Sequence, residues 1–155
     1  MHRDSEINIL IVGEGPLLDK ILECLARENL KAHTNLVGWI THDRLPEYLN
    51  EAMLLVIPSF IETGPIIAFE AMACGTLVLA TRVGYIEDIV KDGETGFISS
   101  NNSPDPIAES IVKAVSHPNL DRSSFNARLI AEERPSYGKV AGEYSRLLRD
   151  LGSKH

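Results

Sequence analysis

The segment that most constrains the fold of this chain spans residues 58–75 and reads PSFIETGPIIAFEAMACG. A short apolar run at residues 53–57 precedes it and is typical of a buried parallel strand, which Pro58 ends because proline has no N–H to donate to a sheet. After a loop, Pro65 suits the first turn of a helix, and Gly75 suits the left-handed position just beyond a helix end. The segment therefore predicts a buried strand, a loop and a helix, in that order.

The predicted helix is apolar at every position from Ile66 to Cys74 except Glu70. A helix that is apolar all round is normally buried, so the carboxylate of Glu70 needs a hydrogen-bonding partner. A second carboxylate, Glu62, lies in the loop that leads to the helix N-terminus. Helix N-termini carry unpaired N–H groups and roughly half a positive charge, which suits a phosphate. The segment thus predicts an anion site flanked by two acceptors for hydroxyl groups, as binding of a sugar nucleotide requires.

The size and composition of the chain exclude several classes of protein. Its 155 residues suit one domain over residues 1–155, and a net charge of -7 disfavours a nucleic-acid binder. No apolar stretch approaches the roughly 20 residues of a membrane span, and the polar N-terminus does not resemble a signal peptide, so we expect a soluble cytoplasmic protein. Cys24 and Cys74 are expected to be buried free thiols in a reducing compartment. The five histidines lack metal-ligand spacing, so no metal site is expected.

Strands and helices alternate along most of the chain. Apolar runs predict strands at residues 7–12, 35–40, 53–57, 77–80 and 97–98. Helical patterns occupy residues 17–29, 43–50, 65–74, 86–91, 103–116, 121–132 and 137–151. This order predicts a Rossmann-like α/β fold, in which a parallel sheet has helices on both faces and further helices at the C-terminal end. Ligands of such sheets bind beyond the carboxyl ends of the strands, where the loop before the 65–74 helix lies.

Several polar and glycine residues at these strand ends also have purely structural explanations. Backbone donors or a basic side chain could hold Glu70, and a loop glutamate such as Glu62 commonly stabilises a helix N-terminus. Gly13 opens the turn GEGP, which resembles part of a dinucleotide fingerprint, but Leu18 replaces the third glycine and a tight turn is favoured over phosphate binding. Trp39 can pack at the rim of the core or contact a nucleotide base.

Four motifs follow one another in a characteristic order: PSFIE around Glu62, EAMACG from Glu70, LVLATRVG at residues 77–84 and DGETGF at residues 92–97. This series resembles the C-terminal half of retaining glycosyltransferases with the GT-B fold, the glycosyl transferases group 1 family. The resemblance extends from INILIVGEGP at residues 7–16 to the helix at residues 137–151, which would close the domain. It implies one half of a GT-B fold that binds a nucleoside diphosphate sugar.

The resemblance also implies a role for each site residue. Glu62 would contact the hydroxyls of the donor sugar and act as the catalytic residue, and Glu70 would hold the ribose. The resemblance places these residues around the donor: Glu62, Thr63, Gly64, Pro65, Ile66, Ile67 and Glu70 at the sugar and diphosphate, Trp39 and Ile40 near the base, and Gly13. The implied reaction transfers a hexose from a UDP- or GDP-sugar with retained configuration, and it needs no metal or other cofactor.

Departures from the family pattern qualify this expectation. Pro65 replaces a glycine whose N–H could meet a phosphate, and Tyr85 replaces the second glycine of the family's Gly-Gly-x-Pro-Glu. The basic pair that grips the diphosphate in the family comes from a segment before Ile7. We therefore expect a donor-binding half that is inactive alone and needs an N-terminal acceptor domain or partner chain, through which any peripheral membrane association would arise. The alternative is a non-catalytic α/β module that serves as a partner or scaffold.

Overall fold

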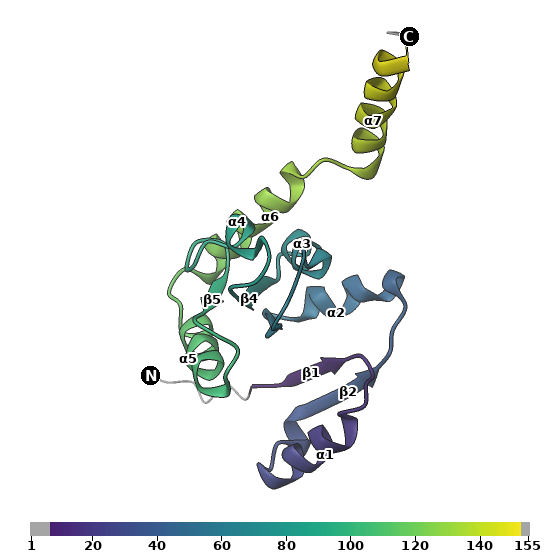
Figure 1. The fold of residues 1–155 in the computed structure, drawn as a ribbon. Coiled ribbons are helices and arrows are strands. Elements are labelled where there is room, and N and C mark those ends of the chain that lie inside the picture. Colours follow the sequence, from purple (N-terminus) through teal and green to yellow (C-terminus); the bar gives the residue numbers. More distant parts are fainter. Residues whose placement is uncertain (1–6, 153–155) are drawn as a thin grey trace. The chain divides into compact units, whose positions relative to one another are not determined.

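The computed structural model describes residues 7–152 (Figure 1). The chain divides into two compact units, Met1–Leu45 and Pro46–His155. Each unit has a parallel sheet of its own, which confirms the α/β class with parallel strands flanked by helices. Every predicted strand and helix is present, with ends that differ by at most two residues. That residues 1–155 act as one domain stays a prediction.

The first unit is built around two parallel strands. Strand β1 (Ile9–Val12) leads through helix α1 (Leu18–Arg27) and a 3-10 turn (Lys31–His33) into strand β2 (Thr34–Gly38), and a second 3-10 turn (His42–Arg44) follows. Ile9 lies opposite Thr34, and the register shifts after Ile11 so that Val12 pairs with Gly38. In β1 half-buried and exposed residues alternate, so one side of this strand is covered and the other is open.

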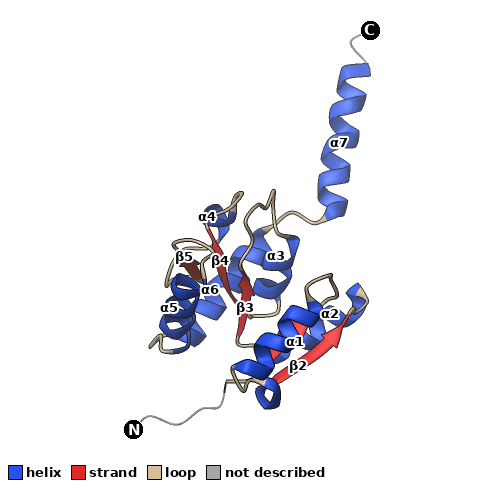
Figure 2. Cartoon of the chain, turned by 60° about the horizontal axis from the view of Figure 1, so that its bottom comes forward, coloured by secondary structure: helices blue, strands red, loops and turns tan. Residues whose placement is uncertain are grey.

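The second unit contains a three-stranded sheet in the order β3-β4-β5 (Figure 2). Strand β3 (Leu54–Ile57) and strand β5 (Phe97–Ser99) pair in parallel with the central strand β4 (Leu77–Thr81). Every residue of β4 is buried, as its unbroken apolar run predicts for a strand covered on both faces.

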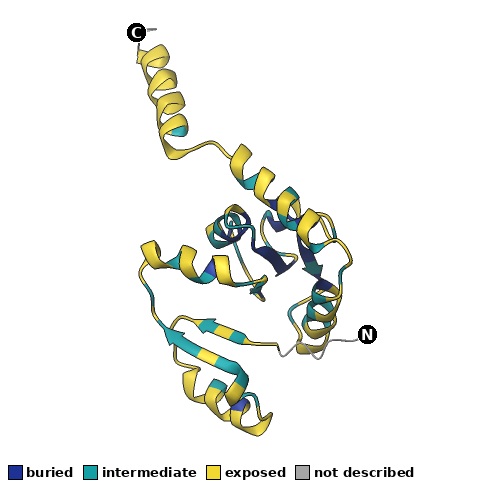
Figure 3. Cartoon of the chain, turned by 180° about the vertical axis from the view of Figure 1, so that it is seen from behind, coloured by how far each residue is buried: buried dark blue, intermediate teal, exposed yellow. Residues whose placement is uncertain are grey.

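Six helices lie along the described part of the chain from Leu45 onward. They are α2 (Leu45–Glu51), α3 (Ile66–Ala73), α4 (Ile86–Ile89), α5 (Pro104–Val115), α6 (Leu120–Glu133) and α7 (Tyr137–Gly152). Helices α3 and α6 pack on each other and on β4, and α5 packs on β4 and β5. The buried segments, dark blue in Figure 3, therefore gather in this sheet and the helices packed on it. Met72, Val78 and Phe97 are fully buried.

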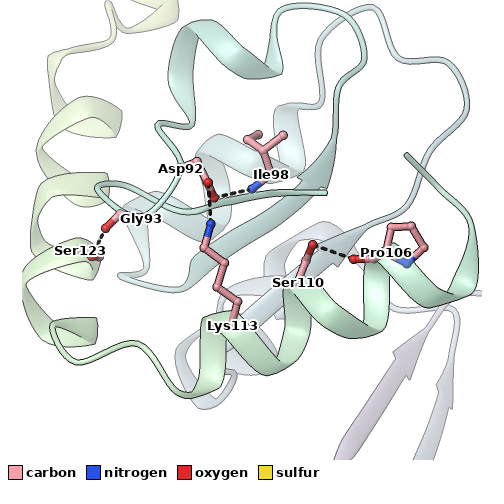
Figure 4. Close-up of polar contacts among 7 residues, drawn as sticks. All are labelled: Asp92, Gly93, Ile98, Pro106, Ser110, Lys113 and Ser123. Atoms are coloured by element: carbon pink, nitrogen blue, oxygen red, sulfur yellow. Dashed lines mark hydrogen bonds and ion pairs between the residues drawn. The ribbon is translucent and has the colours of Figure 1, made fainter. Parts of the chain in front are cut away.

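A tight turn before β5 ties this strand to two helices (Figure 4). The carboxylate of Asp92 accepts a hydrogen bond of 3.1 Å from the N–H of Ile98. It also forms an ion pair with Lys113 on α5, whose Nζ lies 2.6 Å from Oδ2. Ser123 on α6 donates to the carbonyl oxygen of Gly93, 3.1 Å away. The DGETGF motif thus anchors the edge strand of the sheet.

The predicted burial of both cysteines is wrong. Cys24 is exposed, because the apolar stripe of α1 runs through Leu18, Ile21 and Leu25, and Cys24 lies off that stripe. Cys74 is half-buried at the C-terminal end of α3.

The last helix forms as predicted and leaves its apolar side chains uncovered. Tyr144, Leu147 and Leu148 are 55 to 66% exposed, and no residue of α7 is buried. None of the helices within residues 7–152 combines the length and apolarity needed to cross a bilayer.

Candidate functional site

The loop between β3 and α3, residues 58–65, carries Glu62 and is called the Glu62 loop. Glu62 is half-buried, and Oε1 of its carboxylate accepts a hydrogen bond of 2.9 Å from Oγ of Ser59. The carbonyl oxygen of Ser59 in turn accepts a hydrogen bond of 2.6 Å from Oγ1 of Thr81, the last residue of β4. The carboxylate is therefore held within its own loop, and the loop is held to the end of the neighbouring strand.

The loop after β4, residues 82–85, lies directly against the Glu62 loop and is called the Tyr85 loop. A β-carbon added to Gly64 would overlap ring atoms and the hydroxyl of Tyr85. A β-carbon added to Gly84 would overlap the carbonyl oxygen of Glu62, and Gly84 also has a φ of +57° that side chains rarely adopt. Both glycines are thus required by the close approach of the two loops.

Helix α3 begins at the end of the Glu62 loop. Pro65 is the residue just before the first helical residue, one position earlier than predicted, with φ -71° and ψ 100°. The N–H of Ala68 donates to the carbonyl oxygen of Pro65 at 3.0 Å. The N–H groups of Ile66 and Ile67 belong to the first turn, where a helix supplies no acceptor of its own. The helix can therefore offer these two donors to an anion.

Glu70 lies in the second turn of the same helix and is half-buried. Burial raises the pKa of the Cys74 thiol one turn later, and the negative charge of Glu70 raises that pKa further. The helix ends as predicted, with Gly75 at φ +81°. The predicted site residues from Glu62 to Glu70 thus lie on one loop and the first two turns of one helix.

The remaining predicted residues lie in the first unit, at the carboxyl ends of β1 and β2. The N–H of Gly13 donates to the carbonyl oxygen of Gly38 at 2.7 Å, which joins the two strand ends. Trp39 is 69% exposed and Ile40 is half-buried. The structure therefore brings Gly13 close to the strand end that carries Trp39, as the parallel pairing predicts.

Sequence reasoning missed the residues that support the Glu62 loop. Ser59 and Thr81 fix it by hydrogen bonds, although Ser59 belongs to the PSFIE motif and could have been singled out as a partner of Glu62. Arg134, which follows α6, places its guanidinium carbon 3.7 Å from the ring centroid of Phe69 on α3. Arg134 lies far along the chain from Phe69, and nothing in its local sequence indicates this contact.

No cluster of three or more His, Cys, Asp or Glu side chains in the described part of the chain could hold a metal ion. The independence of the site from metals and other cofactors stays a prediction.

The one basic side chain of the Tyr85 loop, Arg82, forms an ion pair with Glu87.

Comparison with known proteins places this arrangement in a family. Residues 1–130 match the family described as glycosyl transferases group 1. An uncharacterized glycosyltransferase of Methanocaldococcus jannaschii is 32% identical over 121 residues, which are 78% of this chain and 34% of that protein. Sucrose-phosphate synthase from Thermosynechococcus elongatus superposes with a TM-score of 0.81 at 28% identity, over 94% of this chain and 39% of that one. HepE from Anabaena, solved in complex with UDP-glucose, shares the fold with a TM-score of 0.81 at 19% identity, over 94% of this chain and 42% of that one.

Parallel strands with flanking helices and polar loops at the carboxyl ends of the strands define a ligand-binding α/β class. Within that class, the chain belongs to the glycosyl transferases group 1 family and corresponds to the C-terminal domain of GT-B glycosyltransferases, which confirms the resemblance seen in its motifs. It spans 34% of the Methanocaldococcus relative and 39% of the synthase.

Proposed function

We propose that this chain is the donor-binding domain of a retaining glycosyltransferase that transfers a hexose from a UDP- or GDP-sugar. The observation that carries the proposal is the Glu62 loop, which places a carboxylate held by Ser59 beside the N-terminus of α3. Membership of a glycosyltransferase family gives this arrangement its chemical context. The complex of HepE with UDP-glucose favours a sugar nucleotide as the ligand.

The proposed division of labour follows from the chemistry of the two carboxylates and the helix end. Glu62 accepts hydrogen bonds from hydroxyls of the donor sugar, and Glu70 accepts them from the ribose. The N–H groups of Ile66 and Ile67 face the diphosphate. When the diphosphate departs, each well-placed donor stabilises the developing negative charge by about 3 kcal/mol. By the family resemblance, Trp39 and Ile40 in the first unit contact the base, and Gly13 is also a donor-binding residue.

The acceptor is held outside this chain, by an N-terminal domain of a longer protein or by a partner chain. We therefore expect no transfer activity from residues 1–155 alone, and we keep the prediction of a cytoplasmic location. A non-catalytic module is the second candidate function. One observation favours it: Pro65 is buried at the start of α3 and has no N–H to offer a phosphate.

Calorimetric titration of the folded chain with UDP, GDP and their glucose and mannose derivatives tests the donor-binding role. We expect millimolar or tighter binding of at least one of these ligands. A folded chain that binds none of them would contradict the proposal. Transfer activity after addition of an N-terminal half encoded upstream would exclude the non-catalytic alternative.

A further inference from the structure

The side chain of Tyr85 fills the space directly over Gly64. Cε1, Cζ and the hydroxyl oxygen of Tyr85 would all overlap a β-carbon built on Gly64. Gly64 has no left-handed backbone conformation, so the tyrosine ring alone makes a larger residue unfavourable at this position. The ring and the backbone of the Glu62 loop therefore form one packed contact.

The ring of Tyr85 also packs against Phe69 on α3. Its centroid lies 6.4 Å from that of Phe69, with the planes tilted by 42°, within the range of favourable aromatic pairs. The guanidinium of Arg134 stacks on Phe69 at 3.7 Å, as a cation–π pair does. The tyrosine ring is therefore linked through Phe69 to α3 and, through Arg134, to the end of α6.

The backbone on either side of Tyr85 is also fixed. Gly84 lies against the carbonyl oxygen of Glu62, and Ile86, the first residue of α4, is fully buried. Burial of Ile86 thus anchors the backbone of Tyr85 independently of the Glu62 loop, and the contact with Phe69 holds the ring against α3.

We propose that Tyr85 is a positioning residue that holds the Glu62 carboxylate in place for the donor sugar, and so favours sugar nucleotides over bare nucleotides. The proposal rests on the donor-binding function proposed above. Gly64 is two residues after Glu62 and directly before Pro65, so a displacement of Gly64 changes where the carboxylate lies relative to the N-terminus of α3. The nucleotide contacts assigned to Glu70 lie on the helix itself and do not depend on this loop.

Two measurements on the full chain test the role of Tyr85. The first, which needs no ligand, is hydrogen exchange of the backbone N–H groups of residues 59–64. The second is the ratio of the dissociation constants of UDP-glucose and UDP, repeated with GDP-mannose and GDP. For Tyr85→Ala we expect faster exchange in residues 59–64, about tenfold weaker binding of the sugar nucleotide and less than about twofold change for the bare nucleotide.

Three further variants make the test specific. Tyr85→Phe keeps the ring and should behave as the unchanged protein. Gly64→Ala should weaken binding of the sugar nucleotide as much as Tyr85→Ala does. In the double variant with Tyr85→Ala, Gly64→Ala should weaken this binding no further, because the added methyl group then has room. Tyr137→Ala on α7, where the tyrosine is 86% exposed, is the matched control and should change neither measurement. Gly64→Ala carries the test by itself if Tyr85→Ala does not fold.

The possible results separate the two proposals. Unchanged exchange in residues 59–64, or equal losses for sugar nucleotides and bare nucleotides, would overturn the positioning role while donor binding stands. If the wild-type chain is folded and binds no nucleotide, this result would overturn donor binding, and the role of Tyr85 with it.

Discussion

Oγ of Ser59 donates a hydrogen bond of 2.9 Å to Oε1 of Glu62, within the loop that joins β3 to α3. The same serine uses its carbonyl oxygen to accept from Thr81 at the end of β4. One residue thus connects the carboxylate assigned to the sugar with the central strand of the sheet. The fold therefore positions the Glu62 carboxylate before any ligand binds.

Replacing this serine should weaken binding of the sugar. A hydrogen bond to a charged group contributes about 1.5 to 3 kcal/mol, and because Glu62 is half-buried we expect the lower end, or about a tenfold loss of affinity for a sugar nucleotide in Ser59→Ala. Calorimetric titration measures the loss. Ser110→Ala is the matched control, because Ser110 donates to the carbonyl oxygen of Pro106 within α5 (Figure 4). An equal loss in both variants would contradict a specific role for Ser59.

The two glutamates should affect different parts of the ligand. Glu70→Gln should weaken binding of UDP or GDP by about tenfold, since a ribose hydroxyl loses a charged acceptor. Glu62→Gln should leave binding of the bare nucleotide nearly unchanged and weaken binding of the sugar nucleotide by a similar factor. A panel of nucleotides and their sugar derivatives measured with both variants checks this. Parallel losses across the whole panel would show that the roles are assigned wrongly.

Asp92 should matter more to stability than its ion-pair partner. Asp92→Ala removes both the acceptor for the N–H of Ile98 and the partner of Lys113, so we expect a loss of about 1 to 2 kcal/mol in the free energy of unfolding. Lys113→Ala removes only an ion pair whose two side chains are about half exposed, and such pairs contribute about 0 to 1 kcal/mol. Urea denaturation of the two variants compares them, and a larger loss for Lys113→Ala would contradict the anchoring role of the turn.

The two cysteines should differ in their reaction with iodoacetamide. Cys24 is exposed, whereas Cys74 is half-buried and its pKa is raised by burial and by Glu70. A raised pKa keeps the thiol protonated to higher pH, and only the thiolate reacts, so labelling of Cys74 should be slow near pH 7.5 and rise steeply in more alkaline buffer. Peptide mapping after timed labelling measures both rates. Glu70→Gln should speed the labelling of Cys74, and Cys24→Ser removes the competing site; equal rates for both cysteines at pH 7.5 would contradict this account.

The order of strands and helices was predictable because its signals are local. The apolar run of β4, the proline before α3 and the glycine after it each act through their own backbone or nearest neighbours. The exposure of Cys24 does not follow from its place in an apolar helical pattern, because burial depends on which side of α1 faces the sheet.

For the candidate site, the chemical groups and their placement on one loop and one helix follow from the sequence. Glu62, Gly64 and Glu70 lie within a few residues of one another, so the turn from strand to helix is enough to gather them. The contacts that hold the loop in place, in contrast, depend on how the helices pack in the folded chain. The contact of Tyr85 with Gly64 and the stacking of Arg134 on Phe69 join residues that are far apart along the chain, and they form because α3 and α6 pack on each other and on β4, the strand that the Tyr85 loop follows.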